Sequence, residues 1–596
     1  MTTHRFSVPD LSRRLLAPIA ALLGLVAGLT VLILPSPAPT TASPTEFSAE
    51  RAMASINRLA DEPHSVLRRE AHDRARDDVI GMFSDLGYTA DVHSDPLFDF
   101  SIPEDKETFD MLSTEQQAAV KDAPAETIVV DVPGKSERTM ALMAHYDSAT
   151  VEADENGHQH ITDGTSPGAS DDGYGVAAIV ETLRALKAEG RQPENSLKIV
   201  ITDAEEIGLV GARNEMQHHR ADYENVDLVL NLEARGTSGP AFMFETSPNN
   251  SAVAGYFLSH VKQPVSSSLL PSLYARMPNG TDMNVLIPKG FTVLNIAAIG
   301  EAEHYHHATD APRYVDHSTL QHYGDQVLGL TRAWAFDGQA PTLTADGDLH
   351  FFQLWRGLTV RYPAAVGTGL GCLAVIAALG TVAMRARSLR WKRVLGTVWG
   401  LTWRSALASA AAGLVQLGAM AMKWAPESGL GPNPLLPWMF AGGALIGVGL
   451  TVRFVVRRWK EGLGQEAVAA VLLLLAAACI PLMVLLPGAA YVLVLPTLAL
   501  ALTALAPQRM RPVVGALAAF IIVVIFAPTI LLIHELLSLG AVWVTVFFAI
   551  VPVAPLALVL LQAGSRRTRS TIAWTSSSSD GVPDGAATAG RAAATA

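Results

Sequence analysis

Eight stretches of the chain are almost entirely apolar, and their lengths suit helices that cross a bilayer. A spanning helix needs about 20 consecutive, mostly apolar residues. The stretches cover residues 15–34, 363–384, 395–422, 436–454, 465–486, 488–506, 512–533 and 540–562. The pattern therefore predicts one N-terminal and seven C-terminal transmembrane helices, with a long polar segment between them. The seven form a transmembrane domain over residues 361–563, and residues 1–35 hold the first span.

Basic residues gather on one side of the predicted spans. Short loops rich in Lys and Arg stay on the cytoplasmic side. With eight spans, every basic cluster falls on the side of the N-terminus: Arg385, Arg387, Arg390, Lys392 and Arg393; Arg453, Arg457, Arg458 and Lys460; Arg509 and Arg511; Arg566, Arg567 and Arg569. We therefore expect a multi-pass protein of the cell membrane, with both termini in the cytoplasm and residues 36–360 outside. The first span is expected to be an anchor, and a cleaved signal peptide is the alternative.

The segment between the spans alternates strand and helix signals. Short apolar runs of β type lie at 127–132, 138–144, 197–202, 226–232, 241–244 and 291–297. Residues 175–188 carry apolar side chains at helical spacing, and 318–336 resembles a closing helix. Strands separated by helices predict an α/β domain over residues 48–350, with a mostly parallel central sheet flanked by helices. We expect an extended, unpacked linker at 36–47 and a disordered cytoplasmic tail at 564–596.

Composition agrees with a membrane protein and narrows the chemistry. Of the 596 residues, 49% are hydrophobic and only 17% are charged, against about 25% charged in an ordinary soluble domain. The net charge of −12 gives no support for a nucleic-acid partner. The two cysteines, Cys372 and Cys479, both lie in apolar runs, so we expect neither a disulfide framework nor a thiolate metal site.

Acids and histidines follow the predicted strands of the outer domain. The segments concerned are 145–147, 167–173, 203–208, 231–236 and 301–310. In open α/β sheets, ligands bind beyond the carboxyl ends of the strands. Carboxylates that meet there would repel one another, and no comparable set of Lys or Arg is nearby, so divalent cations would resolve the conflict. Imidazole and carboxylate without thiolate favour a catalytic zinc site, and two metals sharing one carboxylate would match aminopeptidase chemistry.

These motifs, in this order, resemble those of the co-catalytic di-zinc exopeptidases. The motifs are His-x-Asp at 145–147, Gly-Ala-Ser-Asp-Asp-Gly at 168–173, Asp-Ala-Glu-Glu at 203–206, Asn-Leu-Glu-Ala at 231–234 and Tyr-His at 305–306. The family, metallopeptidase clan MH, includes aminopeptidases, glutamate carboxypeptidase and glutaminyl cyclases, and the resemblance covers residues 50–340. An anchor, an outer peptidase domain and several later spans look like its membrane-bound branch in vacuolar and endoplasmic-reticulum membranes.

The resemblance implies a ligand set for two zinc ions per chain. His145 and Glu233 would bind the first ion, Glu206 and His306 would bind the second, and Asp171 would bridge them. The peptide bond after Asp171 is often cis in the family. Glu233 stands where many soluble members have Asp, which changes the reach of the side chain but not its chemistry as a ligand.

The resemblance also implies two roles in catalysis. Asp147 would orient the ring of His145, and Glu205 would be the general base. His307 stands where the family usually has Thr, so it is the alternative to His306 as a ligand. Arg235 is ambiguous, because it would either orient a substrate carboxylate or pair with a nearby acid. Asp282 would line the substrate pocket or stabilise a turn.

The sequence thus predicts a membrane-tethered, zinc-dependent exopeptidase, most simply an aminopeptidase, that hydrolyses peptides outside the cytoplasm. Its reaction would use water activated by two metals, with Glu205 as base. Two alternatives stay open: a single-zinc aminoacyltransferase like the glutaminyl cyclases, and a non-catalytic ectodomain associated with a receptor or transporter. The expected partners are a peptide substrate and the lipid bilayer, and the role of the seven later spans is left open.

Overall fold

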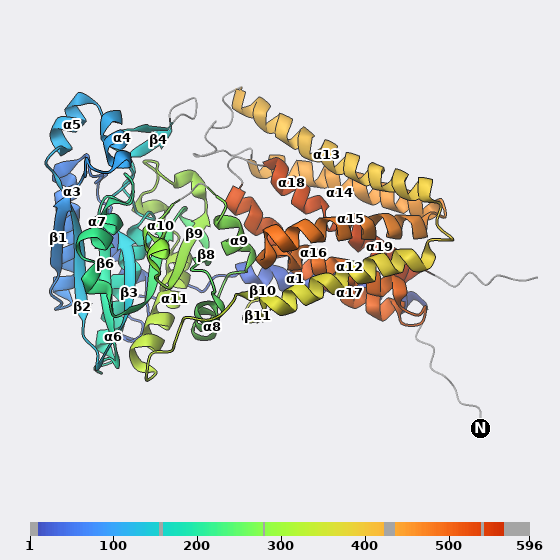
Figure 1. Ribbon diagram of the computed structural model, residues 1–596, viewed down its shortest axis with the longest axis horizontal. Helices are drawn as coiled ribbons and strands as arrows, with labels where there is room; N and C mark the ends of the chain where they lie inside the picture. The colour runs from blue at the N-terminus through green and yellow to red at the C-terminus, as the bar shows by residue number, and fades with distance from the viewer. Residues whose placement is uncertain (1–9, 154–158, 278–279, 422–435, 538–541, 566–596) are drawn as a thin grey trace, which may run out of the picture. The chain divides into compact units, whose positions relative to one another are not determined.

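The computed structural model describes residues 10–153, 159–277, 280–421, 436–537 and 542–565 (Figure 1). The expected disordered tail therefore lies outside the described residues, apart from its first two positions. Within the described chain, the polar segment forms a domain built on one sheet, and the apolar stretches form helices.

A seven-stranded sheet is the centre of the outer domain. From one edge to the other the strands are β1 (Asp91–Pro96), β2 (Pro124–Val132), β6 (Asn195–Thr202), β3 (Ser136–His145), β7 (Val226–Ala234), β9 (Val293–Gly300) and β8 (Ser238–Thr246). All six predicted apolar runs overlap strands of this sheet, and only residues 291 and 292 fall outside them. Two small hairpins, β4 (Val151–Ala153) with β5 (Gln159–Ile161) and β10 (Leu349–Trp355) with β11 (Leu358–Pro363), stand apart from it.

The prediction of a mostly parallel sheet is wrong, because the sheet is mixed. The four central strands β6, β3, β7 and β9 are parallel, whereas β1, β2 and β8 pair antiparallel with their neighbours. Residues 133–135 alone join β2 to β3, and residues 235–237 alone join β7 to β8. Parallel strands need a crossover connection of a dozen or more residues. The strand that follows each of these short connections must therefore run in the opposite direction to the strand before it.

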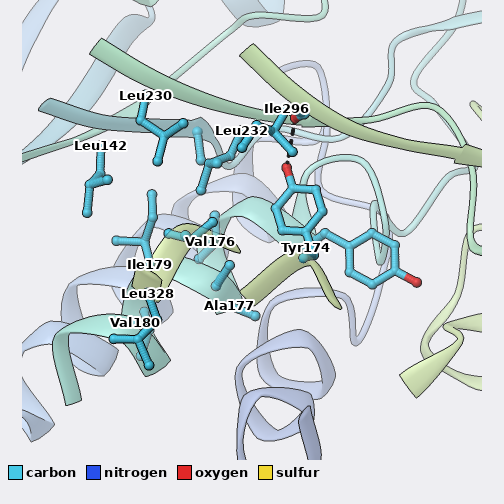
Figure 2. Close-up of a cluster of buried hydrophobic side chains, with 14 of the residues drawn as sticks. Leu142, Tyr174, Val176, Ala177, Ile179, Val180, Leu230, Leu232, Ile296 and Leu328 are labelled. Atoms are coloured by element: carbon cyan, nitrogen blue, oxygen red, sulfur yellow. Dashed lines mark hydrogen bonds between the residues drawn. The ribbon is translucent and has the colours of Figure 1, made fainter. Parts of the chain in front are cut away.

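Helices cover both faces of the sheet, because successive side chains of the central strands point to opposite sides. In β3, Met140 and Leu142 belong to one apolar cluster, and Ala141 and Met143 belong to another. Figure 2 shows the first cluster, in which strand residues meet helical side chains such as Val176. Helices α2 (Ala49–Leu59), α6 (Gly173–Ala188) and α11 (His317–Phe336) supply that face, and α7 (Val210–His218) and α10 (Met283–Leu286) supply the other.

The remaining helices of the outer domain lie around this core. They are α3 (Arg69–Asp85), α4 (Pro103–Met111), α5 (Thr114–Val120), α8 (Ser251–His260) and α9 (Leu269–Tyr274). The segment 36–47, expected to be unpacked, is instead held against the domain. Arg51 donates to the carbonyls of Thr40 and Ala42, and Arg184 donates to the carbonyl of Pro44. The polar backbone of this segment thus finds partners on the domain surface.

All eight predicted apolar stretches contain helix, but the count of eight spans is corrected. The helices are α1 (Asp10–Leu29), α12 (Ala364–Arg385), α13 (Trp391–Ala421), α14 (Leu436–Lys460), α15 (Gly464–Leu485), α16 (Tyr491–Leu505), α17 (Arg511–Leu537), α18 (Val542–Ile550) and α19 (Val553–Gly564). Among the described residues, five helical segments are long and apolar enough to cross a membrane: Arg14–Leu32, Ala364–Arg385, Gly464–Leu485, Arg511–His534 and Val542–Gly564. Helix α16 is shorter, with 15 residues, and α13 carries Arg404 among Ser, Thr and Gly residues that reduce its hydropathy.

The N-terminal helix α1 packs closely on α17. A Cβ atom at Gly24 would lie 2.8 Å from the carbonyl oxygen of Phe520, and one at Gly28 would lie 3.0 Å from that of Val524. Small residues at this spacing allow two helix backbones to approach within a membrane. The N-terminal helix therefore has a specific packing partner among the later apolar helices.

One buried histidine links α11 to the sheet and gives a pH prediction. His322 is 2% exposed; its Nδ1 accepts from the Ala241 amide at 3.1 Å, and its Nε2 donates to the Gln263 carbonyl at 2.9 Å. Burial, with a contribution from Arg356, lowers the pKa of His322 to about 4. The unfolded chain takes up a proton near pH 6.5, whereas the folded chain does so only near pH 4.

The contribution of His322 to stability is therefore complete above pH 6.5 and falls as the pH is lowered through that window, by up to about 3 kcal/mol. His322→Gln, which cannot titrate, should lose this dependence. The check is the difference in free energy of unfolding between wild type and variant, from chemical denaturation at pH 7.5 and pH 4.5. Exposed His218→Gln is the matched control, and a difference for His322→Gln that does not change with pH would contradict the assignment.

Candidate metal centre

The predicted site residues converge at the carboxyl ends of the parallel strands. His145 is the last residue of β3, Glu233 is the penultimate residue of β7, and Glu206 follows β6 by four positions. His306 follows β9, and Asp171 lies two residues before α6. Because these strands are parallel neighbours, their ends meet at one edge of the sheet. The structure thus brings all five predicted ligands together.

Asp171 lies between the two histidines. Its Oδ1 is 3.4 Å from Nε2 of His145, and its Oδ2 is 3.3 Å from Nε2 of His306. Nε2 of His306 is also 3.1 Å from Oε1 of Glu206. Two groups with ligand atoms within 4.8 Å of one another share Asp171: one with His145 and Glu233, the other with Glu206 and His306. Two adjacent cation positions with one common carboxylate fit this arrangement.

The atoms that face the centre have no other partners. Nε2 of His145, Nε2 of His306 and Oε1 of Glu206 are buried and make no hydrogen bond within the described chain. A buried polar atom left without a partner costs free energy, and three of them aimed at one point suit a bound cation. The donor set of imidazole and carboxylate, without thiolate, fits zinc with a position open for chemistry. The residues present therefore fit the metal that the sequence suggests.

Charge in the centre is strongly unbalanced without a cation. Burial raises the pKa of Glu205, and the nearby Glu233 raises it further. Burial likewise raises the pKa of Glu206 to about 7 and that of Glu233 well above its usual value. Burial alone would lower the pKa of His306, but attraction to Glu206 and Asp171 raises it to about 10. The cluster thus holds more negative charge than its own side chains neutralise.

Asp147 supports both the first histidine and the acidic pair. Nδ1 of His145 donates to the backbone carbonyl of Asp147 at 3.0 Å, and the Asp147 carboxylate lies 3.4 Å from the same nitrogen. That carboxylate also accepts from the amides of Glu205 at 3.0 Å and Glu206 at 3.2 Å. Ala204, just before them, has a φ of +55°, and strained backbone of this kind clusters at functional sites. Asp147 therefore fixes the backbone from which the side chains of Glu205 and Glu206 extend.

Asp172 and His307 follow predicted ligands in the sequence but belong to none of the possible ligand groups among the described residues. The peptide bond between Asp171 and Asp172 is cis, as the resemblance implies. Oδ1 of Asp172 accepts from the Gly175 amide at 3.0 Å and so caps α6. His306, with a φ of +59°, places its ring in the centre. His307 belongs to none of the possible ligand groups among the described residues.

Asp310 is a buried residue that holds the loop carrying Asp171, and no sequence motif assigns it a role. It is 0% exposed, and its carboxylate accepts from the Ser170 amide at 2.8 Å, the Ser170 hydroxyl at 2.7 Å and the Asp171 amide at 3.2 Å. Burial raises its pKa to about 7. The only signal in the sequence is an acid four positions after His306, which no motif singles out.

Tyr323 on α11 has a similar supporting role, and Asp282 is a buried structural acid. The Tyr323 hydroxyl accepts from the Glu233 amide at 2.7 Å and lies 2.9 Å from the Glu233 carbonyl. Asp282 accepts from the Thr202 hydroxyl at 2.6 Å and does not line the cavity beside the centre. Nothing in the sequence pattern of α11 marks Tyr323, because it has the spacing of an ordinary core residue.

A cavity of 260 Å³ opens beside the centre. Glu205, Glu206, Glu233 and Asp171 line one part of it, and Arg235 and Tyr305 lie at the same cavity. The rest of its wall is mostly apolar: Leu209, Phe242, Phe244, Leu270, Tyr274, Met277, Ala297 and Ile299. A concave apolar pocket with a few convergent polar groups is the usual form of a small-ligand site.

Comparison with known proteins gives related membrane peptidases over part of the chain. Endoplasmic reticulum metallopeptidase 1 of Mus musculus is 27% identical over 221 residues, which is 36% of this chain and 24% of that protein. A vacuolar membrane protease of Lodderomyces elongisporus is 28% identical over 202 residues, covering 33% of this chain and 19% of that protein. The matched region thus spans about a quarter or less of the length of these relatives.

Two solved structures align with about half of the chain. A zinc aminopeptidase from Bacillus subtilis matches 51% of this chain and 98% of its own, with a TM-score of 0.38 and 14% identity. A glutaminyl cyclase from Porphyromonas gingivalis matches 48% of this chain and 98% of its own, with a TM-score of 0.35 and 18% identity.

The family match covers the segment that carries the site. Residues 127–331 match Peptidase family M28, and this range includes every predicted ligand from His145 to His306. The chain therefore contains a Peptidase family M28 domain, followed by apolar helices long enough to cross a membrane.

Proposed function

We propose that this protein is a membrane-tethered, zinc-dependent exopeptidase, most simply an aminopeptidase, that acts on peptides outside the cytoplasm. One observation carries the proposal: five ligand residues from separate segments converge, with Asp171 common to two ligand groups. The family match and the names of the relatives support a hydrolase that acts on peptides. We further propose that the N-terminus is cytoplasmic and that the domain with the metal centre lies on the other side of the membrane, as the distribution of basic residues favours.

Each ligand residue has a defined place in this proposal. His145, Asp171 and Glu233 would hold one zinc ion, and Asp171, Glu206 and His306 would hold the other. Zinc bound there supplies Lewis acidity and a water molecule of lowered pKa. Asp147, Asp310 and Tyr323 hold these ligands in position through the hydrogen bonds described above.

Glu205 is the group best placed to move a proton. It lines the cavity and belongs to a possible ligand group with His145 and Glu206, yet neither of the two groups that share Asp171 needs it. We propose that Glu205 takes a proton from the attacking water and returns it to the leaving amine. Burial and the neighbouring acids favour its protonated form, which suits the second of these transfers.

The first prediction from the proposed function concerns Glu205. In Glu205→Gln the side chain keeps its shape but cannot accept the proton, so kcat should fall by about 10²–10⁴-fold, with metal content unchanged. Hydrolysis of aminoacyl-aminocoumarin substrates and the zinc content of the purified full chain give the two readouts. Exposed Glu224→Gln is the control, and a Glu205→Gln enzyme with near wild-type kcat would refute the assignment.

The second prediction concerns the number of metal ions. Elemental analysis of the purified chain should give two zinc ions per chain, and treatment with 1,10-phenanthroline should abolish hydrolysis until zinc is restored. His306→Ala should retain one zinc, whereas exposed His218→Ala should retain two. One zinc in the wild-type protein, together with cyclisation of N-terminal glutamine, would favour the aminoacyltransferase instead.

The third prediction concerns Asp310. Asp310→Ala removes the acceptor for three donors of the loop that carries Asp171, so metal affinity should fall by about 10–100-fold. Competition with a zinc-binding dye measures this affinity directly. Exposed Asp346→Ala should leave the affinity unchanged, and an equal loss in both variants would show that Asp310 has no particular link to the centre.

A further inference from the structure

Arg235 occupies a fixed place at the rim of the candidate centre. It follows β7 directly, two residues after Glu233, and its amide donates to the carbonyl of Ala298 at 2.7 Å. Its side chain lines the same cavity as Glu205 and Tyr305. The neighbouring strand thus anchors the backbone of Arg235 beside the space where a substrate would react.

The Arg235 guanidinium has no acid of its own within the described chain. Its Nε is buried and without a hydrogen-bond partner, and Arg235 takes part in none of the ion pairs among the described residues. Other half-buried arginines of this domain are paired: Arg51 with Glu181 at 2.8 Å and Arg332 with Glu189 at 2.7 Å. A half-buried cation without a counter-ion is unusual enough to suggest a ligand.

The acids beside Arg235 are already committed to other roles. Asp171, Glu205, Glu206 and Glu233 are the carboxylates that line the cavity. Under the proposed function, these four carboxylates face two divalent cations, so they are not available as counter-ions for Arg235. The positive charge of Arg235 is then without a counter-ion, and it disfavours any further cation in its vicinity. An anionic group of the substrate would neutralise it.

The apolar wall of the cavity limits what the rest of that substrate can be. Phe242, Phe244 and Ile299 are each less than 10% exposed and present only apolar surface. A bulky apolar side chain would bury its surface there, at about 25 cal/mol for each Å² removed from water. A ligand with an apolar residue close to a carboxylate matches the end of a short peptide.

We propose that Arg235 binds the terminal carboxylate of a dipeptide whose N-terminal residue is bulky and apolar. The inference rests on the proposed function and specifies its substrate class. Successive Cα atoms are 3.8 Å apart, so the carboxylate of a dipeptide lies within one residue of the scissile bond. Arginine binds such a group through two parallel hydrogen bonds. In longer peptides the carboxylate lies beyond this reach, and Arg235 meets a neutral amide instead.

Matched substrates test the proposal on the full-length chain in detergent. Leu-Leu and Leu-Leu-amide differ only in the terminal charge, and kcat/KM should be about tenfold or more higher for Leu-Leu. Arg235→Met should remove this preference, mainly through a higher KM for Leu-Leu. Arg235→Lys, which keeps the charge but loses the planar fork, should retain part of the preference. Arg313→Met, at an exposed arginine outside the cavity, is the matched control.

A binding measurement separates the failure of this inference from failure of the proposed function. In the Glu205→Gln background, calorimetric titration should show tighter binding of Leu-Leu than of its amide, and Arg235→Met should abolish the difference. Equal affinities or equal kcat/KM for the two peptides would overturn the role of Arg235 while leaving the peptidase intact. An equal loss for both peptides in Arg235→Met would also overturn it. If the wild-type protein hydrolyses no peptide but still shows the binding preference, the proposed function fails and Arg235 remains a carboxylate site.

Discussion

The outer domain is organised around one electrostatic constraint, the crowding of carboxylates at a single edge of its sheet. The acids there are largely buried, and the pKa of most of them is raised, which means that the folded chain favours their neutral forms when no cation is present. Two imidazoles do not balance them. The constraint explains why so much of the surrounding structure consists of hydrogen bonds to the ligand segments. Asp147 holds the acidic pair, Asp310 holds the loop before α6, and Tyr323 holds the end of β7. Each of these residues restrains a backbone segment whose acidic side chains would otherwise move apart.

The mixed sheet brings the predicted ligand segments to one edge, although its outer strands pair antiparallel with their neighbours. The four adjacent parallel strands β6, β3, β7 and β9 deliver their carboxyl ends to the same edge, and these strands carry or precede four of the five predicted ligands. The antiparallel strands cover the flanks. The reversal from β7 into β8 over residues 235–237 has a further consequence, because it places Arg235 at the rim of the cavity and not on a long connecting loop.

The sequence predicted those features that depend on local pattern and missed those that depend on distant contacts. All six apolar runs overlap strands, because a strand buried on both faces must be apolar along its length. The ligand motifs were found because acids after apolar runs are conspicuous. In contrast, β1 has an exposed, polar face and gives no such signal. Tyr323 and Asp310 look like an ordinary core residue and an ordinary loop acid until the fold brings them to Glu233 and Ser170. The number of spans was overestimated, because apolar character alone does not fix the length of a helix such as α16.

The cavity wall connects the chemistry of the outer domain with the apolar helices. Phe242 and Ile299 belong to one buried cluster with Val31, next to the N-terminal helix, and Leu532 of α17. Ser268 also donates to the carbonyl of Gly488, between α15 and α16, at 2.7 Å. The side chains that would receive an apolar substrate residue therefore pack against the helices on their other side. If those helices were removed, the wall would lose packing partners, and closely packed interiors respond to such losses with shifts of neighbouring side chains. The helices are thus part of the support of the cavity wall, in addition to any role in anchoring, and the proposed specificity should be measured on the full chain.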